Sequence, residues 1–396
     1  MSIPCREARP VFLRRIITLT ACGVLCGGSF LLGAPYTSAN VPAARPHWRV
    51  VARAAGGSLG VVVAPRATSA WAFGWGAHPP AGRIFPIGRH WNGHRWSGVQ
   101  FPSGVKNSGM SCAGASSQTN VWAFSGAGAS GGNPPSTVSA LRLRSAHWIV
   151  AKNFPGSYVT GCNVLSKTNV WVFGGAVAGL GRGIGTWHFS ESSWRQFNTG
   201  NLVLFNASAV SATDIWAAAA DVSNSSRIQP VIARWNGHSW REITSIRSAL
   251  PKVTSTTTVG VDNIKALSAS NVWVLATVFR QSTISYVVVH WNGHTWSRVR
   301  RGSPGYYLPT AVRDGSGGWW SPPYLPNNTV PYLLHRTHGS WARSSLPVRL
   351  TIFIGAIGST FGISHVPHSH AMLVAGASMQ SNTLTGVVLA LGRLPT

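Results

Sequence analysis

The hexapeptide Trp91-Asn92-Gly93-His94-Arg95-Trp96 returns as Trp235-Asn236-Gly237-His238-Ser239-Trp240 and as Trp291-Asn292-Gly293-His294-Thr295-Trp296. Asn-Gly is the strongest short signal for a β-hairpin, because both residues tolerate the positive φ of a two-residue type I′ turn. With Asn92-Gly93 as the turn, we expect Trp91 to pair with His94, and Arg89 with Trp96. A hairpin cannot bury two indoles alone, so the repeated copies predict repeated sheets that stack on one another.

A second repeated phrase precedes each hairpin. It is a turn of Ser, Thr, Asn or Asp that leads into a Trp and an apolar run, as in Thr119-Asn120-Val121-Trp122. This composition predicts the start of a β-strand. Five regular copies contain Trp71, Trp122, Trp171, Trp216 and Trp273, a bent sixth contains Trp319-Trp320, and a degenerate seventh surrounds Met372.

The second Trp of each repeat defines how the repeats are connected. Six repeats have one, and the seventh repeat lacks it because the chain ends soon after an apolar run at 386–391. The missing copy lies at the other end of the chain, where His47-Trp48 is similar to His147-Trp148. Only a closed ring needs a strand from the amino end to complete the last repeat. We therefore predict an all-β fold, a seven-bladed β-propeller of four-stranded blades that the N-terminal strand closes by completing the last blade.

On these motifs, the chain resembles the secreted bacterial β-propeller repeat proteins, broadly the kelch, tectonin and Asp-box propellers. The resemblance covers about residues 45–396. It implies that a ligand would meet the face formed by two kinds of loop: those between the second and third strands of a blade, and those between successive blades. The hairpin and Thr-x-x-Trp turns would lie on the opposite face, so we interpret the paired Trp as packing between blades. We interpret His94, His238 and His294 as cross-strand partners.

The first 39 residues are predicted to be a signal peptide. Basic residues precede an apolar run of about 19 residues at 16–34, and the small residues Thr37-Ser38-Ala39 follow it. An uncleaved N-terminal membrane anchor is the alternative, since the run is just long enough to span a bilayer. We expect residues 40–396 to form a single propeller domain that is secreted or at the cell surface, and monomeric.

The charge of the chain is strongly positive. It has 33 Lys and Arg against 7 Asp and Glu, a formal net charge of +26. Such a charge favours an anionic partner such as an acidic polysaccharide, another envelope polymer or a protein, although charge scattered over a solvated surface is the alternative. There is no nucleic-acid motif and no long basic run, so we do not expect nucleic acid. We expect membrane association only through an uncleaved leader.

The scarcity of carboxylates indicates a second property. Acid unfolds proteins largely by protonating carboxylates that are paired in the native state. Because only six carboxylates follow the leader, we hypothesise that the protein tolerates an acidic exterior.

Two cysteines follow the leader. Cys112 lies ten residues before Trp122, and Cys162 lies nine residues before Trp171. These matching places in successive repeats permit a disulfide, which is common in secreted chains. Two separate buried thiols are the alternative.

The sixth repeat is irregular and rich in aromatic residues. Tyrosine and tryptophan rings suit stacking on sugars or peptides, and nearby arginines suit an anionic ligand. A locally repacked blade is the alternative. The candidate ligand-binding residues are Tyr306, Tyr307, Trp320, Tyr324, Arg298, Arg300 and Arg301.

Catalysis is the weaker hypothesis. A glycoside hydrolase needs two positioned carboxyl groups, and only Asp221 and Asp262 are expected on ligand-side loops. The histidines of the 365–370 segment have no neighbouring carboxylate or Cys, so we predict no metal and no cofactor. We therefore expect a non-catalytic extracytoplasmic binding module. The alternative is a glycan-processing enzyme, a glycoside hydrolase or polysaccharide lyase on the same scaffold.

Overall fold

The computed structural model describes residues 46–395, except for 79–82, 106–107, 127–136, 176–182, 225–226, 282, 326–328, 352–360 and 382. The expected leader lies outside the described residues. Within them, no helix is both long enough and apolar enough to cross a membrane.

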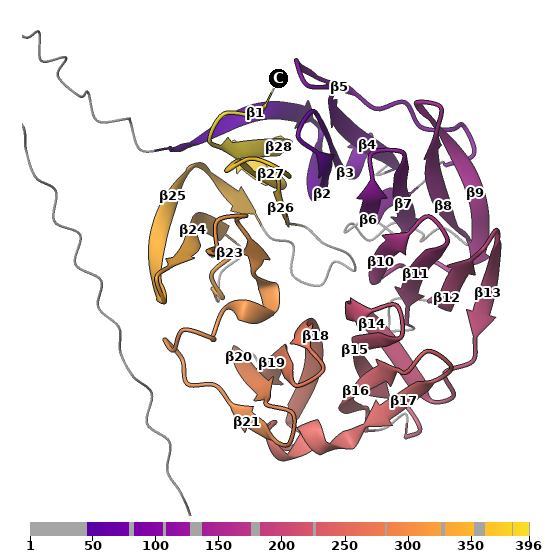
Figure 1. The fold of residues 1–396 in the computed structure, drawn as a ribbon, viewed down its shortest axis with the longest axis vertical. Helices are drawn as coiled ribbons and strands as arrows, with labels where there is room; N and C mark the ends of the chain where they lie inside the picture. Colours follow the sequence, from indigo (N-terminus) through magenta and orange to yellow (C-terminus); the bar gives the residue numbers. More distant parts are fainter. Residues whose placement is uncertain are drawn as a thin grey trace, which may run out of the picture. The chain divides into compact units, whose positions relative to one another are not determined.

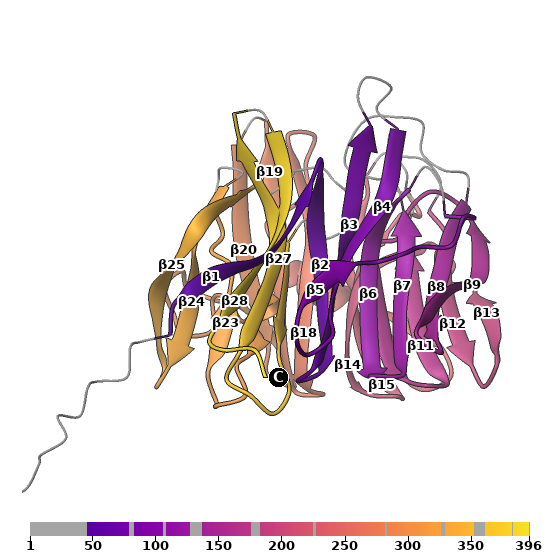
Figure 2. The same ribbon diagram turned by 90° about the horizontal axis from the view of Figure 1, so that it is seen from above.

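The described residues form a ring of seven antiparallel blades, which confirms the predicted β-propeller (Figure 1). Five blades are separate four-stranded sheets. The sixth and seventh are joined by one pairing, Thr351 with Ala377, into a single eight-stranded sheet. The strands run between the two faces of the ring (Figure 2).

Within each blade, the first-named strand is the innermost and the last-named strand is the outermost. Blade 1 comprises β2 (Gly57–Arg66), β3 (Ser69–His78), β4 (Arg83–Trp91) and β5 (Trp96–Gly98). Blade 2 comprises β6 (Gly109–Ser117), β7 (Asn120–Gly126), β8 (Thr137–Arg144) and β9 (His147–Pro155). Blade 3 comprises β10 (Gly161–Ser166), β11 (Asn169–Gly174), β12 (Gly185–Ser190) and β13 (Ser193–Phe197). Blades 4 and 5 comprise β14 (Leu202–Ser211), β15 (Asp214–Asp221), β16 (Gln229–Trp235) and β17 (Trp240–Ile243); β18 (Thr257–Ser268), β19 (Asn271–Arg280), β20 (Thr283–Trp291) and β21 (Trp296–Arg298). Blades 6 and 7 comprise β22 (Val312–Arg313), β23 (Trp319–Ser321), β24 (Thr329–Thr337) and β25 (Ser340–Thr351); β26 (Gly362–His365), β27 (Met372–Gln380), β28 (Thr383–Leu391) and β1 (Trp48–Ala55).

The two ends of the described chain close the ring. Strand β1 pairs antiparallel with β28, with Trp48 opposite Leu391 and Val50 opposite Leu389. The strand near the amino end is therefore the outermost strand of blade 7, as the sequence predicts. The two strands lie side by side in Figure 1.

Neighbouring blades are held together by pairs of indole rings. At five of the seven boundaries, the Trp of the outermost strand meets, edge to face, the Trp on the second strand of the preceding blade. This arrangement adds to the free energy gained by burying the rings. The ring centroids are 5.2–6.5 Å apart and the interplanar angles are 72–90° for Trp71–Trp148, Trp122–Trp194, Trp171–Trp240, Trp216–Trp296 and Trp320–Trp48. The interpretation of the paired Trp as packing between blades is confirmed.

The second-strand Trp is also covered from within its own blade, by a His or Arg on the third strand. His90, His188, His290 and His335 stack on their Trp with centroids 3.7–4.0 Å apart. In blades 2 and 4 an arginine takes this place, with the guanidinium carbon of Arg142 5.0 Å and that of Arg234 4.6 Å from the ring centroid.

The third-strand His or Arg is oriented by the Ser/Asn/Asp turn that precedes the Trp. The Nε2 of His188 lies 3.0 Å from Oδ1 of Asn169, and the Nε of Arg234 donates to Oδ1 of Asp214 at 2.7 Å. The turn residues of the second repeated phrase therefore fix the partner that covers the indole.

The hairpin turn differs from the expectation. Trp91 pairs with Trp96, so the loop has four residues, and the φ of Gly93 is +93°. Oδ1 of Asn92 accepts hydrogen bonds from the backbone N–H of His94 and Arg95, which is the geometry of an Asx turn. The other two hairpins have the same bonds.

The prediction of a two-residue type I′ turn is therefore wrong. The role given to the hairpin histidines is also wrong, because the side chains of His94, His238 and His294 are exposed at the loop. The histidines that pack on indoles lie on the third strand, at positions fixed by the true register.

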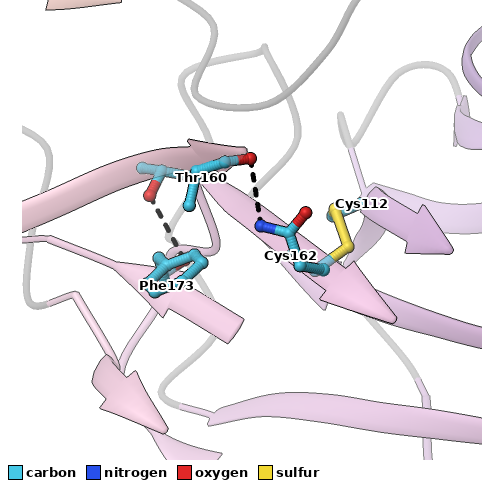
Figure 3. The surroundings of a disulfide bond; sticks show 6 residues. Cys112, Thr160, Cys162 and Phe173 are labelled. Atoms are coloured by element: carbon cyan, nitrogen blue, oxygen red, sulfur yellow. Dashed lines mark hydrogen bonds between the residues drawn. A yellow bond between two sulfur atoms is a disulfide. The ribbon is translucent and has the colours of Figure 1, made fainter. Parts of the chain in front are cut away.

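Cys112 on β6 and Cys162 on β10 form a disulfide between the innermost strands of blades 2 and 3 (Figure 3). Their Cα atoms are 6.1 Å apart, which is within the usual span of a disulfide. Nearby, both the backbone N–H and the hydroxyl of Thr160 donate to the carbonyl oxygen of Phe173, at 2.8 and 3.2 Å. The bridge and these bonds fix the start of β10.

Removing the disulfide should destabilise the ring. Closing a loop between residues 50 positions apart is worth about 4 kcal/mol in the chain-entropy model. We expect the double variant Cys112→Ala/Cys162→Ala to lose roughly this free energy of unfolding in urea titrations. Intact mass with and without reductant should differ by two hydrogens for the parent protein and not for the variant. An unchanged unfolding midpoint would contradict the prediction.

The stacked histidines should make stability depend on pH. Burial lowers the pKa of His90 and His290, and that of His188 to about 4, from an unfolded value near 6.5. Between these pH values the unfolded chain binds more protons, so stability is lost as the pH falls from 6.5 towards 4. The histidines therefore oppose the acid tolerance hypothesised from the carboxylate count.

We expect His188→Arg, which copies the Arg of blades 2 and 4, to reduce this acid loss by about 2 kcal/mol. Urea unfolding at pH 7 and pH 4.5 measures it. His94→Arg, at the exposed hairpin, is the matched control and should lose as much stability as the parent. An equal acid loss in both variants would show that His188 is not responsible.

Candidate functional site

Blade 6 departs from the repeat on the face where loops connect successive blades. Its two inner strands, β22 and β23, have only two and three residues. Pro322 and Pro323 follow β23 directly, and proline has no N–H to continue a strand pairing. The connection from blade 5 to blade 6 contains a short 3-10 helix, Leu308–Thr310. These segments leave room between blades 5, 6 and 7.

A central cavity occupies this room, and two further cavities adjoin it. The central cavity, of about 310 Å³, is lined by Tyr286, Tyr324, Asn263 and Thr310, among others. It shares Tyr286 and Tyr324 with an outer cavity of about 370 Å³, and Asn263 and Thr310 with an inner cavity of about 350 Å³. We call the central and outer cavities together the tyrosine track.

Three tyrosines, Tyr286, Tyr306 and Tyr324, line the tyrosine track, and a fourth, Tyr307, packs against them. The ring of Tyr324 lies 5.1–5.6 Å from the rings of Tyr286, Tyr306 and Tyr307. The hydroxyl of Tyr324 is 3.2 Å from Oγ1 of Thr310. Burial raises the pKa of all four hydroxyls, so they are neutral hydrogen-bonding groups near pH 7.

Arginines lie at the outer end of the track. Arg298 and Arg301 line the outer cavity and have exposed side chains. The Nε of Arg298 donates to the carbonyl oxygen of Ala249 at 2.7 Å, which fixes its guanidinium at the rim. Arg301 lies close enough to Tyr306 and Tyr307 to offset part of the effect of burial on their pKa. The rim therefore presents positive charge beside aromatic rings.

The structure brings most of the predicted site residues together. Tyr306, Tyr324, Arg298 and Arg301 line the outer cavity. Tyr307 packs against Tyr324 but lines neither cavity. Arg300 is exposed on the same connection, and no cavity of the track includes it.

Trp320 belongs to the scaffold, which corrects its inclusion in the site. Its side chain is 3% exposed, stacked on His335 and edge-on to Trp48. It occupies the second-strand position that holds a Trp in every other regular blade. Its ring is therefore not available to a ligand.

Several residues that line the cavities were not expected from the sequence. Tyr286 lies within the apolar run of β20, and Asn263 and Lys265 lie on β18. Polar residues on an innermost strand were a usable signal, because that strand borders the central channel of a propeller. Tyr286 gave no comparable signal, since tyrosine is common in strands.

The two expected carboxylates lie on strands, which corrects their assignment to loops. Asp221 ends β15, and its pKa is lowered mainly by the N–H of Ser223 and further by Arg247, whose Nη2 lies 3.3 Å from Oδ2. The carboxylate of Asp221 is therefore already bonded to protein groups and has a structural role.

Asp262 lies at a bulge in β18, where the register shifts between Val261 and Asn263. Asp262 is an exposed residue, but protein groups around its carboxyl remove part of the hydration of that group. This desolvation raises the pKa of Asp262 to about 6. The hydroxyl of Thr277 donates to its carboxylate, and its charge raises the pKa of Tyr286. Asp262 is thus the carboxylate that adjoins the tyrosine track.

The histidine segment of blade 7 makes internal bonds. The Nε2 of His365 is 2.7 Å from the carbonyl oxygen of Ser369, and the Nδ1 of His370 is 2.7 Å from Oγ of Ser316. Among the described residues, no three His, Cys, Asp or Glu side chains gather as metal ligands. These bonds connect the segment to the turn of blade 6.

No protein-family model and no curated protein sequence matches this chain. Solved structures do resemble it. YCF48 bound to D1 peptide has a TM-score of 0.49 at 12% identity, covering 86% of this chain and 96% of that one. A Trypanosoma rangeli sialidase in complex with an inhibitor has a TM-score of 0.42 at 10% identity, over 85% and 55% of the two chains.

The GH74 xyloglucanase from Xanthomonas campestris has a TM-score of 0.41 at 13% identity, covering 84% of this chain and 65% of that one. The similar structures thus include both a protein with a bound peptide and glycan-processing enzymes. At these scores and identities they do not discriminate between binding and catalysis.

The two aspartates should affect stability with opposite signs. The folded pKa of Asp262 lies above the unfolded value of 3.8, so Asp262 costs stability as the pH rises through 3.8 to 6. The folded pKa of Asp221 is lowered, so its contribution is present above pH 3.8 and is lost as the pH falls. Relative to the parent, we expect Asp262→Asn to raise and Asp221→Asn to lower the unfolding midpoint at pH 7.5.

At pH 3, which is below the unfolded pKa of 3.8 of both carboxyls, each difference should shrink. Urea unfolding at the two pH values measures it. A change of the same sign in both variants at pH 7.5 would contradict the assigned environments.

Proposed function

We propose that this protein is a non-catalytic extracytoplasmic binding module that recognises an extended anionic ligand, with an acidic glycan or envelope polymer as the leading class. The observation that supports this most directly is the tyrosine track. Its cavities of about 310 and 370 Å³ share Tyr286 and Tyr324 and lead out to Arg298 and Arg301. Cavities of this size, lined by rings and a few polar groups, are typical of ligand sites.

The balance of charge supports an anionic ligand. Five of the six carboxylates after the leader lie away from the track. Asp214, Asp221, Glu242 and Asp314 form ion pairs or bonds with Arg or His, and Glu191 lies in the turn between β12 and β13. Only Asp262 adjoins it, through Tyr286. The arginines at the rim therefore face few competing negative charges from the protein itself.

The arrangement of rings supports a sugar-like ligand. Tyrosine rings provide apolar faces for stacking, and their neutral hydroxyls can donate to or accept from sugar hydroxyls. A peptide with acidic and apolar residues has related chemistry, so an acidic protein segment is the second class of ligand.

A glycan-processing enzyme is the alternative function, and Asp262 is the observation that favours it. A carboxyl group with a pKa of about 6 suits a general acid. Retaining and inverting glycosidases need a second carboxyl about 5–9.5 Å away. Among the described carboxylates, Asp221 is held by Arg247 and Ser223, which weakens its candidacy as that partner.

The location at the cell exterior belongs to the same proposal. It is supported by the basic and apolar leader in the sequence and by the Cys112–Cys162 bridge, because disulfides persist mainly in oxidising compartments. A monomeric state is part of the proposal too.

Oligogalacturonate binding tests the proposal. We expect affinity for this acidic oligosaccharide, measured by calorimetry, to fall as salt rises from about 50 to about 300 mM, because added ions screen charge contacts. Neutral dextran oligomers should bind weakly or not at all. The double variant Arg298→Gln/Arg301→Gln should weaken binding by roughly 5- to 10-fold, as two rim contacts are lost.

The matched control is Arg95→Gln/Arg241→Gln, which removes the same charge from exposed arginines of outer hairpins. It should leave affinity nearly unchanged. Equal losses in the two variants would mean that only net charge matters and that the track is not the site. Binding of poly-glutamate but not of oligogalacturonate would favour the protein class. Appearance of shortened oligosaccharides that Asp262→Asn abolishes would favour the enzyme.

A further inference from the structure

The inner cavity, about 350 Å³ in volume, lies against the innermost strands of blades 3, 4 and 5. Its lining is mainly polar and includes Asn163, Asn206, Ser208, Asn263 and Lys265. We call it the channel site. It adjoins the tyrosine track through Asn263 and Thr310, but its own residues come from β10, β14 and β18.

Lys265 is the unusual member of this lining. Its ammonium makes no hydrogen bond or ion pair with any other residue that the structure describes. It is half-buried, and burial lowers its pKa. A desolvated charge without a counter-ion is costly, so an isolated lysine at such a place needs an explanation.

Arg313 adds a second positive charge beside Lys265. It lies on β22, the innermost strand of blade 6, and its guanidinium carbon is 4.7 Å from the centroid of the Trp319 ring. It is close enough to Lys265 to lower the pKa of the lysine further. Arg313 does not line the channel site, but its positive charge adds to that of Lys265.

The described carboxylates do not neutralise this pair. Asp262, three residues before Lys265, accepts from Thr277 and interacts with Tyr286. Asp314, next to Arg313, accepts from the backbone N–H of Ser316 and Gly318 and lies 2.9 Å from Nε2 of His335. A negative charge at the channel site would have to come from a bound molecule.

Neutral donors around Lys265 complete the arrangement. Nδ2 of Asn206 donates to Oδ1 of Asn263 at 3.0 Å, which leaves the Asn263 amide N–H groups to donate elsewhere. Oγ of Ser208 accepts from the backbone N–H of Ala266 at 3.0 Å, so its hydroxyl hydrogen is also free to donate. A ligand in the cavity would thus meet donors and positive charge.

We propose that the channel site binds one oxyanion, a carboxylate or a sulfate group, at Lys265, with the Asn263 amide and the Ser208 hydroxyl as further donors. The anion would accept a hydrogen bond from the Lys265 ammonium and neutralise part of the positive charge there. Charge-assisted hydrogen bonds from an ammonium to an oxyanion are among the stronger ones in proteins. The site needs none of the four tyrosines, so a small free oxyanion occupies it, as does the acidic end of a longer ligand lying in the track.

Titration with two small probes, sodium sulfate and the monosaccharide galacturonate, tests the channel site by calorimetry at constant ionic strength. We expect both probes to bind the parent protein. Lys265→Met should weaken binding roughly 10- to 100-fold, because it removes a charged hydrogen bond while keeping an unbranched side chain. Lys265→Arg should retain most of the affinity. Lys167→Met, which removes an exposed lysine from the turn between β10 and β11, is the matched control and should bind like the parent.

A second measurement does not depend on how the variants fold. Acylation of the parent protein by a succinimidyl ester, followed by peptide mapping, reports the reactivity of each lysine. Sulfate should slow modification of Lys265 and leave Lys167 unchanged. Equal binding by Lys265→Met and Lys167→Met, or no protection of Lys265 by sulfate at a concentration that saturates the calorimetric titration, would overturn the proposal.

The results expected for the channel site can be distinguished from those expected for the tyrosine track. If the parent protein binds oligogalacturonate but neither sulfate nor galacturonate, the channel site is wrong and the tyrosine track stands. Sulfate binding without oligogalacturonate binding would support the channel site as a site for free small anions. Binding of oligogalacturonate that Lys265→Met weakens more than Lys167→Met would place the acidic end of the glycan in the channel.

Discussion

The contact on which the ring depends is the edge-to-face meeting of two indoles across each blade boundary. Apart from the pairing of Thr351 with Ala377, the described strands pair only within their own blade, so backbone hydrogen bonds hold blades together at few places. The Trp pairs supply a repeated apolar contact at the same height in five of the seven boundaries. Each buried Trp also presents its other side to a His or Arg of its own blade. One indole thereby ties together two strands and two blades.

The candidate sites lie next to the places where this repeat is interrupted. At the boundary of blades 5 and 6 the indole pairing gives way: Trp341 donates from Nε1 to the carbonyl oxygen of Pro304 and packs edge-on to Tyr307. At the boundary of blades 7 and 1, Leu373 stands where the other blades have Trp. The tyrosine track occupies the first of these interruptions. A regular blade 6 would have filled the space with its own inner strands.

The architecture was predictable because its signals are local and repeated. The Trp-Asn-Gly-His-x-Trp and Thr-x-x-Trp phrases are each contained within a few residues, and Trp48 supplied the missing copy that implied closure. The sixth-repeat tyrosines were found because they broke that pattern. Trp320 was misassigned for the same reason: doubling it with Trp319 hid which of the two occupies the scaffold position.

The register of the hairpins was not predictable from the Asn-Gly pair alone. Asn92 uses its side-chain oxygen to hold the loop open to four residues, so the indoles pair directly and every assignment of a cross-strand partner shifts. Lys265 and Arg313 could not be brought together either, because they lie far apart in the sequence and on different blades. Their charges interact only because blades 5 and 6 are neighbours in the folded ring.

Joining β1 to β28 also has a kinetic consequence. Trp48 and Leu391 pair directly although almost the whole described chain lies between them. Loop-closure entropy grows only slowly with length, but long-range pairing delays folding. Blades 1 to 6 can assemble in order during synthesis, whereas β1 has no strand to pair with until β28 has emerged. Until then, its open edge is the point at which the nascent protein is most prone to pair with another chain.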